Sequence, residues 1–185
     1  SAEIPSTTNQ TLLLDPQLKN TTDRKKKLYL LNEYLETIRT TVFRQTMFAE
    51  FEKDLYARAE AGEAITADLL DAMWHELNVK YYGPQMVVDK AVDIEWARIP
   101  HFYYNFYVYQ YVTGFSAANA LASQILAEGE PARIRYLDFL KSGGSDYSLN
   151  LLKKAGVDMS SPEPIKITID RFSHLLDEME KLLAE

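Results

Sequence analysis

Residues 98–114 read Arg98-Ile-Pro-His-Phe-Tyr-Tyr-Asn-Phe-Tyr-Val-Tyr-Gln-Tyr-Val-Thr-Gly114. Between His101 and Tyr111 this stretch holds five of the twelve tyrosines of the chain. Pro100 suits the first turn of a helix, where a backbone N–H has no partner to lose. No further Pro or Gly interrupts the segment before Gly114. The sequence therefore predicts a helix from about Pro100 to Glu128 that could relax at Gly114.

Helical spacing divides this aromatic stretch into two faces. At roughly 100° per residue, one face carries His101, Tyr104, Val108, Tyr111 and Phe115, with Tyr107 at its border. The opposite face carries Phe102, Phe106, Tyr109 and Thr113. An imidazole and several phenols on one face could donate hydrogen bonds to a carbonyl or an oxyanion. The alternative is an aromatic core helix whose hydroxyls reach the surface, and spacing alone slightly favours this alternative.

The composition is that of a globular protein. The chain has 185 residues, enough for one sizeable domain with its own core, and is 46% hydrophobic and 25% charged. The net charge is −7, and the one basic run, at residues 24–27, is predicted to be a solvated helix face, so we expect no nucleic-acid partner. No apolar stretch has the length of a membrane span, so no membrane partner is expected. The absence of cysteine excludes disulfides and thiolate metal sites and fits a cytoplasmic location.

The rest of the chain is predicted to form one helix after another. Apolar residues recur at helical spacing between Gly and Pro breaks, and no segment shows convincing strand alternation. The predicted helices cover residues 6–18, 23–61, 66–82, 100–128, 131–141, 145–155 and 162 to the end. Pro16 is expected to kink or end the first helix, and residues 85–97 to be irregular apart from a short turn of helix at 93–97. The predicted fold class is all-α, with residues 1–185 as a single helical domain or fragment.

The residues by themselves complete no known catalytic motif. His75-Glu76 begins like the His-Glu-x-x-His of zinc peptidases, but Val79 stands where the second histidine would be. His75 and His174 are interpreted as ordinary helix residues. Gly143-Gly144 is a break between helices and no phosphate-binding loop. From the residues alone, the chain offers a helix that could donate hydrogen bonds and no complete catalytic site.

Several motifs together resemble those of a known family. They are Ile99-Pro-His-Phe-Tyr-Tyr-Asn-Phe-Tyr-Val-Tyr-Gln-Tyr-Val-Thr-Gly-Phe-Ser116, Phe43-Arg-Gln-Thr-Met-Phe-Ala-Glu50, Lys80-Tyr-Tyr-Gly83, Leu140-Lys-Ser-Gly-Gly-Ser-Asp-Tyr147 and Leu152-Lys-Lys-Ala-Gly-Val-Asp158. They occur in the order found in the C-terminal portion of bacterial oligoendopeptidase F, a branch of the thimet-oligopeptidase-like zinc metallopeptidases. The resemblance covers nearly the whole chain. It implies an all-α, multi-helix C-terminal segment of the catalytic domain of a gluzincin-type oligopeptidase.

The resemblance also implies roles for particular residues. Glu3 matches the third zinc ligand of the family, and the two zinc-binding histidines and the glutamate base would precede Ser1. The residues that match the catalytic and oxyanion-binding positions are His101, Tyr104 and Tyr111, and those that match substrate-binding positions are Tyr107 and Tyr109. Two residues depart from the family pattern. Gln10 stands where a glutamate is usual, and Pro16 interrupts a segment that is usually unbroken helix.

The implied function is that of a C-terminal fragment of a zinc-dependent oligoendopeptidase that hydrolyses short peptides. Its partners would be peptide substrates and the missing N-terminal part, and the fragment could self-associate. By itself it is expected to be inactive and to hold no zinc tightly. The alternative is a stand-alone helical module that binds a peptide or protein through its aromatic face and does no chemistry.

If the catalytic interpretation is right, His101, Tyr104 and Tyr111 should look into a cleft. Phe102, Phe106 and Tyr109 should then be buried behind them, because donors to an oxyanion need a rigid backing.

Overall fold

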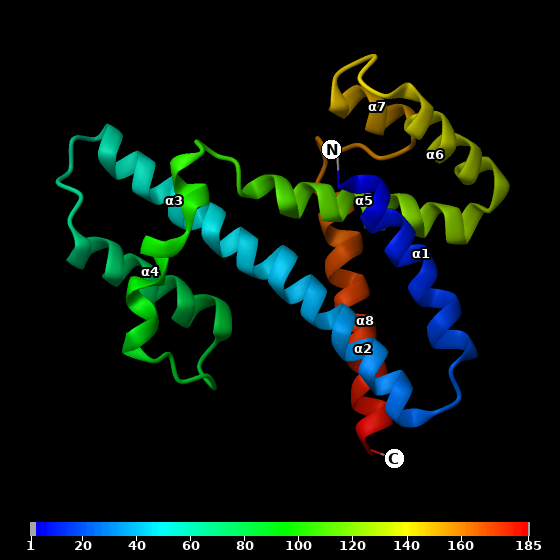
Figure 1. Ribbon diagram of the computed structural model, residues 1–185, viewed down its shortest axis with the longest axis horizontal. Coiled ribbons are helices and arrows are strands. Elements are labelled where there is room, and N and C mark those ends of the chain that lie inside the picture. The colour runs from blue at the N-terminus through cyan, green and yellow to red at the C-terminus, as the bar shows by residue number, and fades with distance from the viewer. Residues whose placement is uncertain (1–2, 185) are drawn as a thin grey trace. The chain divides into compact units, whose positions relative to one another are not determined.

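The regular secondary structure of the chain consists of helices. The computed structural model describes residues 3–184, and over that range it contains no β-strand, so the predicted all-α fold is confirmed (Figure 1). The α-helices are α1 (Ile4–Asn20), α2 (Arg24–Ile38), α3 (Arg44–Glu60), α4 (Ala67–Tyr82), α5 (Tyr109–Glu128), α6 (Glu130–Ser142), α7 (Ser148–Lys154) and α8 (Glu163–Ala184). The shorter elements are the π-helical turn η1 (Arg39–Phe43) and the 3-10 helices η2 (Lys90–Arg98) and η3 (Pro100–Tyr103). No helix within residues 3–184 is both long and apolar enough to cross a lipid bilayer.

The helices group into two compact units. The first unit contains the described residues up to Arg39 and those from Thr113 onward, and the second unit is Thr40–Val112. One boundary falls inside η1 and the other lies near the start of α5. Each unit has its own hydrophobic cluster.

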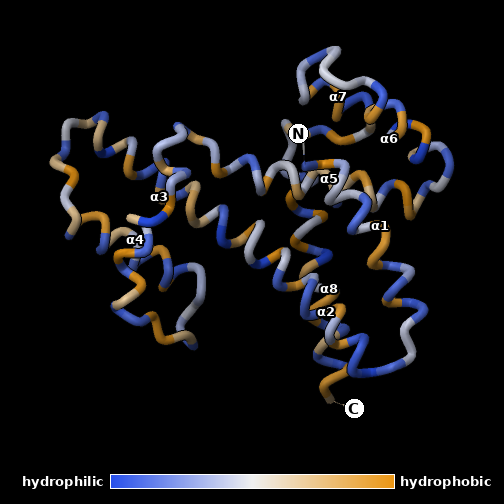
Figure 2. The backbone as a smooth tube through the Cα atoms, viewed as in Figure 1, coloured by the Kyte–Doolittle hydropathy of each residue, from blue (hydrophilic) through white to orange (hydrophobic). Residues whose placement is uncertain are grey.

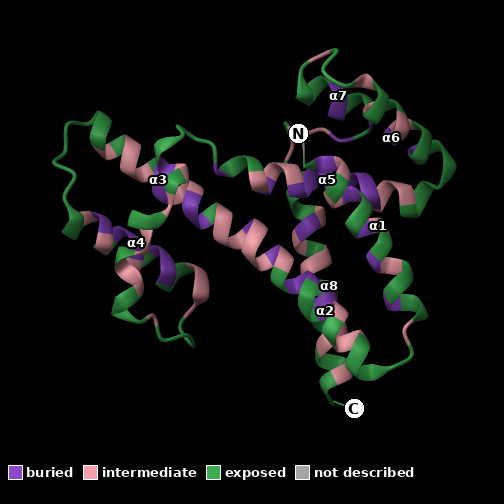
Figure 3. Cartoon of the chain, viewed as in Figure 1, coloured by how far each residue is buried: buried purple, intermediate pink, exposed green. Residues whose placement is uncertain are grey.

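In the first unit, α2 packs against α8 and α1, and α6 packs against α7 (Figure 1). The buried cluster centres on small and aliphatic residues of α5 (Figure 3). Its members are Ile4, Ala117, Ala118, Ala120, Leu121, Tyr136, Leu152, Ala155 and Val157. Hydropathy alternates along α2 and α8, as expected for helices with one buried face (Figure 2).

A buried polar network ties four helices of the first unit together. The Tyr34 hydroxyl on α2 donates to Asn119 Oδ1 on α5 at 2.9 Å and lies 3.0 Å from the Thr11 hydroxyl on α1. The Arg171 guanidinium of α8 lies 5.3 Å from the centre of the Tyr34 ring and pairs with Asp15. Burial raises the pKa of Tyr34. Since Thr11 and Asn119 are fully buried, the Tyr34 hydroxyl satisfies groups that have no access to water.

Pro16, which was predicted to kink or end the first helix, does not end it. The helix begins at Ile4, runs through Pro16 and ends at Asn20. A proline inside a helix removes one backbone hydrogen bond. Leu14 and Leu18, on either side of it, are buried, and their burial offsets that loss.

The second unit is built on an aromatic core. Here α3 packs against α4, and α4 packs against η2. Trp74 and Phe51 are fully buried, with ring centres 5.0 Å apart, and Phe48 lies 5.2 Å from Trp74. The predicted stops after α3 and α4 are present, because Gly62 and Gly83 adopt φ values of 79° and 77° that other residues rarely take.

Residues 85–97 are more regular than predicted. Instead of a short turn of helix at 93–97, the 3-10 helix η2 covers Lys90–Arg98. Asp89 caps it by accepting a hydrogen bond from the Ala91 N–H at 2.8 Å. Such caps favour short helices that hydrophobic periodicity alone does not reveal.

Replacing Tyr34 by Phe tests the polar network. The Tyr34→Phe variant removes the hydroxyl that bonds the buried Asn119 Oδ1 and Thr11 Oγ1, so the free energy of unfolding should fall by about 1–3 kcal/mol. Tyr29→Phe is the control, because Tyr29 is 62% exposed on the same helix, and its effect should stay within about 0.5 kcal/mol. Urea unfolding followed by circular dichroism measures both. Equal effects of the two substitutions would contradict the assigned network.

The effect of Tyr34→Phe on stability should depend on pH. A pKa that is higher in the folded state gives stability that is complete below the unfolded pKa, about 10 for tyrosine, and is lost as pH rises above it. The stability difference between the native protein and Tyr34→Phe should therefore narrow above pH 10. Urea unfolding between pH 7 and pH 11 measures it, and a difference that grows with pH would be the contrary result.

Candidate functional site

The aromatic stretch is a helix, a turn and a second helix. Pro100 begins the 3-10 helix η3, which ends at Tyr103, and α5 begins only at Tyr109. Between them Asn105 and Phe106 have φ values of 46° and 59°, the left-handed region of the backbone. The prediction of one continuous helix from Pro100 to Glu128 is therefore wrong for residues 104–108. Two consecutive left-handed residues cannot be part of a right-handed helix.

Two side chains of α3 hold this turn. Left-handed backbone at a residue other than Gly costs about 1–3 kcal/mol, and Phe106 is an unfavourable residue for it. The Phe106 N–H donates to Glu52 Oε1 at 2.8 Å, and the Tyr56 hydroxyl donates to the Phe102 carbonyl at 2.7 Å. The Tyr56 ring also meets the Phe106 ring edge to face at 4.9 Å. A hydrogen bond to a charged group stabilises by about 1.5–3 kcal/mol, which is comparable to the strain.

Both ends of the turn are anchored in the core of the second unit. Phe102 is buried, with its ring 5.0 Å from that of Phe51 and 5.8 Å from that of Phe48. Val108, at the other end, is fully buried. The residues between these anchors reach the surface, and Tyr104 is 58% exposed. The turn therefore has two buried ends that hold it rigidly and exposed residues between them.

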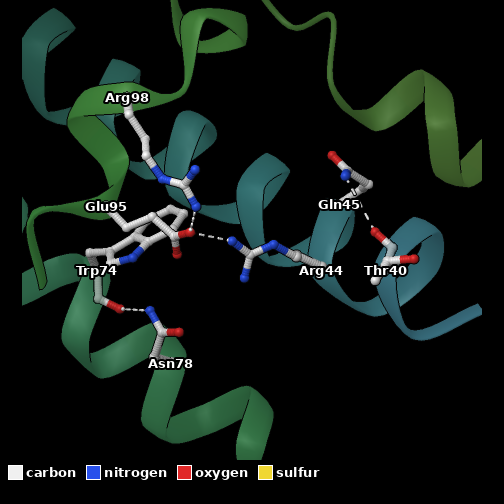
Figure 4. Close-up of polar contacts among 7 residues, drawn as sticks. All are labelled: Thr40, Arg44, Gln45, Trp74, Asn78, Glu95 and Arg98. Atoms are coloured by element: carbon white, nitrogen blue, oxygen red, sulfur yellow. Dashed lines mark hydrogen bonds and ion pairs between the residues drawn. The ribbon is translucent and has the colours of Figure 1, made fainter. Parts of the chain in front are cut away.

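The segment that leads into the turn is cross-linked as well. Glu95 of η2 accepts hydrogen bonds from Arg44 of α3 and from Arg98, and Figure 4 shows both guanidinium groups reaching its carboxylate. The Trp96 indole N–H donates to Asp71 of α4 at 2.7 Å. These contacts fix η2 immediately before Pro100.

The turn brings one histidine and three tyrosines together. The His101 ring centre lies 5.9 Å from that of Tyr104, 5.9 Å from that of Tyr107 and 5.8 Å from that of Tyr111. The Tyr107 ring is nearly stacked on the imidazole, with an interplanar angle of 28°. His101 Nε2 is 3.2 Å from the Tyr111 hydroxyl. These four residues are called the His101 cluster below.

Tyr109 lies apart from this cluster. In the described part of the chain, the ring contacts of His101 involve the other three predicted tyrosines and not Tyr109, which is 49% exposed. The expectation that Phe102 would be buried is confirmed. The same expectation is wrong for Phe106 and Tyr109, which are 43% and 49% exposed. It assumed helical geometry across a turn that is not helical.

The cluster can donate several hydrogen bonds to one ligand. Tyr104 and Tyr107 are 58% and 42% exposed, and His101 and Tyr111 are half-buried. A phenol is both a donor and an acceptor, and an imidazole offers at least one donor nitrogen. Such a set suits a polarised carbonyl or an oxyanion, which accepts more than one hydrogen bond.

Glu3 belongs to the first unit, whereas His101 belongs to the second. It is exposed directly before α1, and its carbonyl accepts hydrogen bonds from Ser6 Oγ at 3.0 Å and the Thr7 N–H at 3.2 Å. A carboxylate is a suitable zinc ligand, but zinc sites take at least three protein ligands. Among residues 3–184 no three His, Asp or Glu side chains are placed to hold one ion. The Glu3 carboxylate is thus a donor of the type that zinc binds, but one carboxylate does not make a zinc site.

Comparison with known proteins places the chain in a family. The family model described as "Peptidase family M3" matches residues 1–171, so the chain belongs to this family of peptidases.

Individual relatives narrow the resemblance to oligoendopeptidase F. The chain is 58% identical to Oligopeptidase PepF of Bacillus subtilis and 45% identical to the plasmid-encoded Oligoendopeptidase F of Lactococcus lactis subsp. cremoris. Each match covers 100% of this chain and 28% or 31% of the relative. The crystal structure of oligoendopeptidase-F from Enterococcus faecium matches with a TM-score of 0.96 and 46% identity, over 99% of this chain and 35% of that one. The resemblance to oligoendopeptidase F is thus confirmed, and the chain spans about a third of the length of such proteins.

Replacing the buried Phe102 should lower the stability of the second unit. Phe102→Ala deletes a buried ring, which typically costs about 3–5 kcal/mol. Tyr103→Ala is the control, because Tyr103 is 82% exposed, and it should change stability by less than about 0.5 kcal/mol. Both tryptophans of the chain, Trp74 and Trp96, lie in the second unit, so tryptophan fluorescence during urea unfolding reports on this unit. A small effect of Phe102→Ala would contradict its role as an anchor.

Proposed function

We propose that this chain is the C-terminal part of a zinc-dependent oligoendopeptidase and that it supplies the residues that bind the carbonyl oxygen of the scissile peptide bond. The observation that supports this most is the His101 cluster, a group of accessible donors on an anchored turn, in a chain that belongs to a peptidase family. The substrates would be short peptides, as the names of the oligopeptidase relatives suggest.

In this proposal His101, Tyr104 and Tyr111 act on the substrate directly. When a nucleophile adds to a peptide carbonyl, negative charge develops on the carbonyl oxygen. Donors already in place stabilise that charge without reorganising. Tyr107, stacked on His101, would hold the imidazole in place and line the substrate site with Tyr109.

Glu3 would be one ligand of the zinc ion in the complete enzyme. The remaining ligands, two histidines, and the general base would come from the part that precedes this chain. That part is therefore the main proposed partner. Location in the cytoplasm remains a prediction from the composition.

A non-catalytic peptide-binding module is the second candidate. The observation that favours it is the exposed aromatic rim, with Tyr103, Tyr104 and Phe106 at 82%, 58% and 43% exposure. Exposed aromatic rings provide contact area for a peptide without any chemistry. Under this alternative the protein has no hydrolytic activity, and replacing the tyrosines would change only its affinity for the peptide.

Removing single hydroxyls in the complete polypeptide that contains this chain tests the catalytic role. Tyr104→Phe and Tyr111→Phe should each lower kcat about a hundredfold to a thousandfold on a short fluorogenic peptide, since one oxyanion donor is lost. KM should change little, because the charge exists only in the transition state. Tyr103→Phe is the matched control on the neighbouring residue and should keep the original rate. An unchanged kcat in both test variants would refute the assignment.

The 185-residue chain alone should hydrolyse no peptide and retain no stoichiometric zinc after dialysis. One carboxylate cannot replace a set of three protein ligands. Zinc analysis by atomic absorption and a peptide assay measure the two properties. Stoichiometric zinc that is lost on replacing two of His75, His101 and His174 would overturn this expectation.

A further inference from the structure

Glu52 is a carboxylate buried in the second unit. It is 1% exposed and lies on α3 next to Phe51, a member of the aromatic core. A buried carboxylate is costly unless it accepts hydrogen bonds. Its partner is the Phe106 backbone N–H, at 2.8 Å. The Glu52 carboxylate therefore binds the backbone of a turn 54 positions later in the sequence. Glu52 belongs to none of the motifs that contain the predicted site residues.

Glu52 acts together with Tyr56, one helical turn further along α3. The Tyr56 hydroxyl donates to the Phe102 carbonyl, so the two side chains hold the backbone on both sides of Tyr104. Burial, followed by the neighbouring Glu52 carboxylate, raises the pKa of the Tyr56 hydroxyl. Tyr56 thus stays a neutral donor beside Glu52.

The conformation held in this way decides where the tyrosines lie. Asn105 and Phe106 both have positive φ, and Phe106 has no glycine-like freedom to adopt it. This reversal lies between Tyr104 and Tyr107, and both rings contact His101, at 5.9 Å. Continuing the right-handed helix past Tyr104 would place Tyr107 differently relative to the imidazole.

We propose that Glu52 is a positioning residue, whose buried carboxylate fixes the left-handed turn at Asn105–Phe106 and thereby assembles Tyr104 and Tyr107 on His101. The importance of this positioning for catalysis rests on the proposed function. The positioning itself does not, and it can be measured in the 185-residue chain without any activity.

Amide hydrogen exchange followed by NMR tests the contact in the unmodified chain. The Phe106 side chain is 43% exposed and the residue lies outside regular helix, so its N–H should exchange rapidly unless a side chain protects it. The account predicts protection of at least about tenfold over an unstructured peptide. Exchange at the unprotected rate would overturn the proposal without any mutation.

Three variants then separate positioning from simple stability. Glu52→Ala should abolish the protection at Phe106 and shift the imidazole signals of His101, because the rings around it move. Glu52→Gln keeps an oxygen acceptor and should restore both. Glu60→Ala is the control, an exposed acid on the same helix, and should leave both unchanged. A Glu52→Ala protein that is less stable but has unchanged His101 signals in its folded state would show a merely structural role and refute the proposal.

Kinetics in the complete polypeptide distinguish this inference from the proposed function. If both hold, Glu52→Ala lowers kcat at least about tenfold, a loss expected when oxyanion donors are displaced, and Glu52→Gln recovers most of it. If Glu52→Ala moves the His101 signals while Tyr104→Phe and Tyr111→Phe leave kcat unchanged, the positioning stands and the proposed function fails. If the hydroxyl variants lose activity and Glu52→Ala does not, the inference fails and the function stands.

Discussion

Burial of Phe102 in the aromatic core is the contact on which the candidate site depends most. Its ring packs among Phe48, Phe51 and Trp74, and burial of this kind contributes more than any single hydrogen bond nearby. With Phe102 fixed, the next five residues can leave the core, reach the surface and return at Val108. The exposed Tyr104 and Tyr107 of the His101 cluster are thus carried by a segment whose two ends are buried, which is how an accessible site stays rigid.

The helical fold could be predicted because its signals are local. Asp23 and Thr66 accept hydrogen bonds from the first turns of α2 and α4, and Gly62 and Gly83 end helices with positive φ. These residues act on neighbours within one helical turn, so the sequence shows them directly. The continuation of α1 past Pro16 could not be predicted, because the burial of Leu14 and Leu18 is decided by contacts with other helices.

The turn at residues 104–108 could not be predicted in the same way. Nothing in the local sequence demands it, since Phe106 disfavours the conformation that it adopts. The turn is stabilised by Glu52 and Tyr56, whose positions relative to it are known only once α3 is packed. Helical spacing nevertheless singled out His101, Tyr104 and Tyr111, and the structure brings these residues together around a turn instead of along one helix. It also places Tyr107, predicted at the border of that face, in the cluster and leaves Tyr109 outside. The catalytic roles of these residues and of Glu3 stay predictions, because they rest on the family resemblance.

A crystal structure of the complete polypeptide with a phosphinic peptide would test the central claim most directly. Such a peptide carries a tetrahedral anionic group in place of the scissile carbonyl, and tight binding of transition-state analogues is expected of peptidases. The account predicts an oxygen of that group within about 2.7–3.1 Å of a donor among His101, Tyr104 and Tyr111. A phosphinate bound elsewhere, with all three donors turned toward solvent or other protein groups, would contradict it.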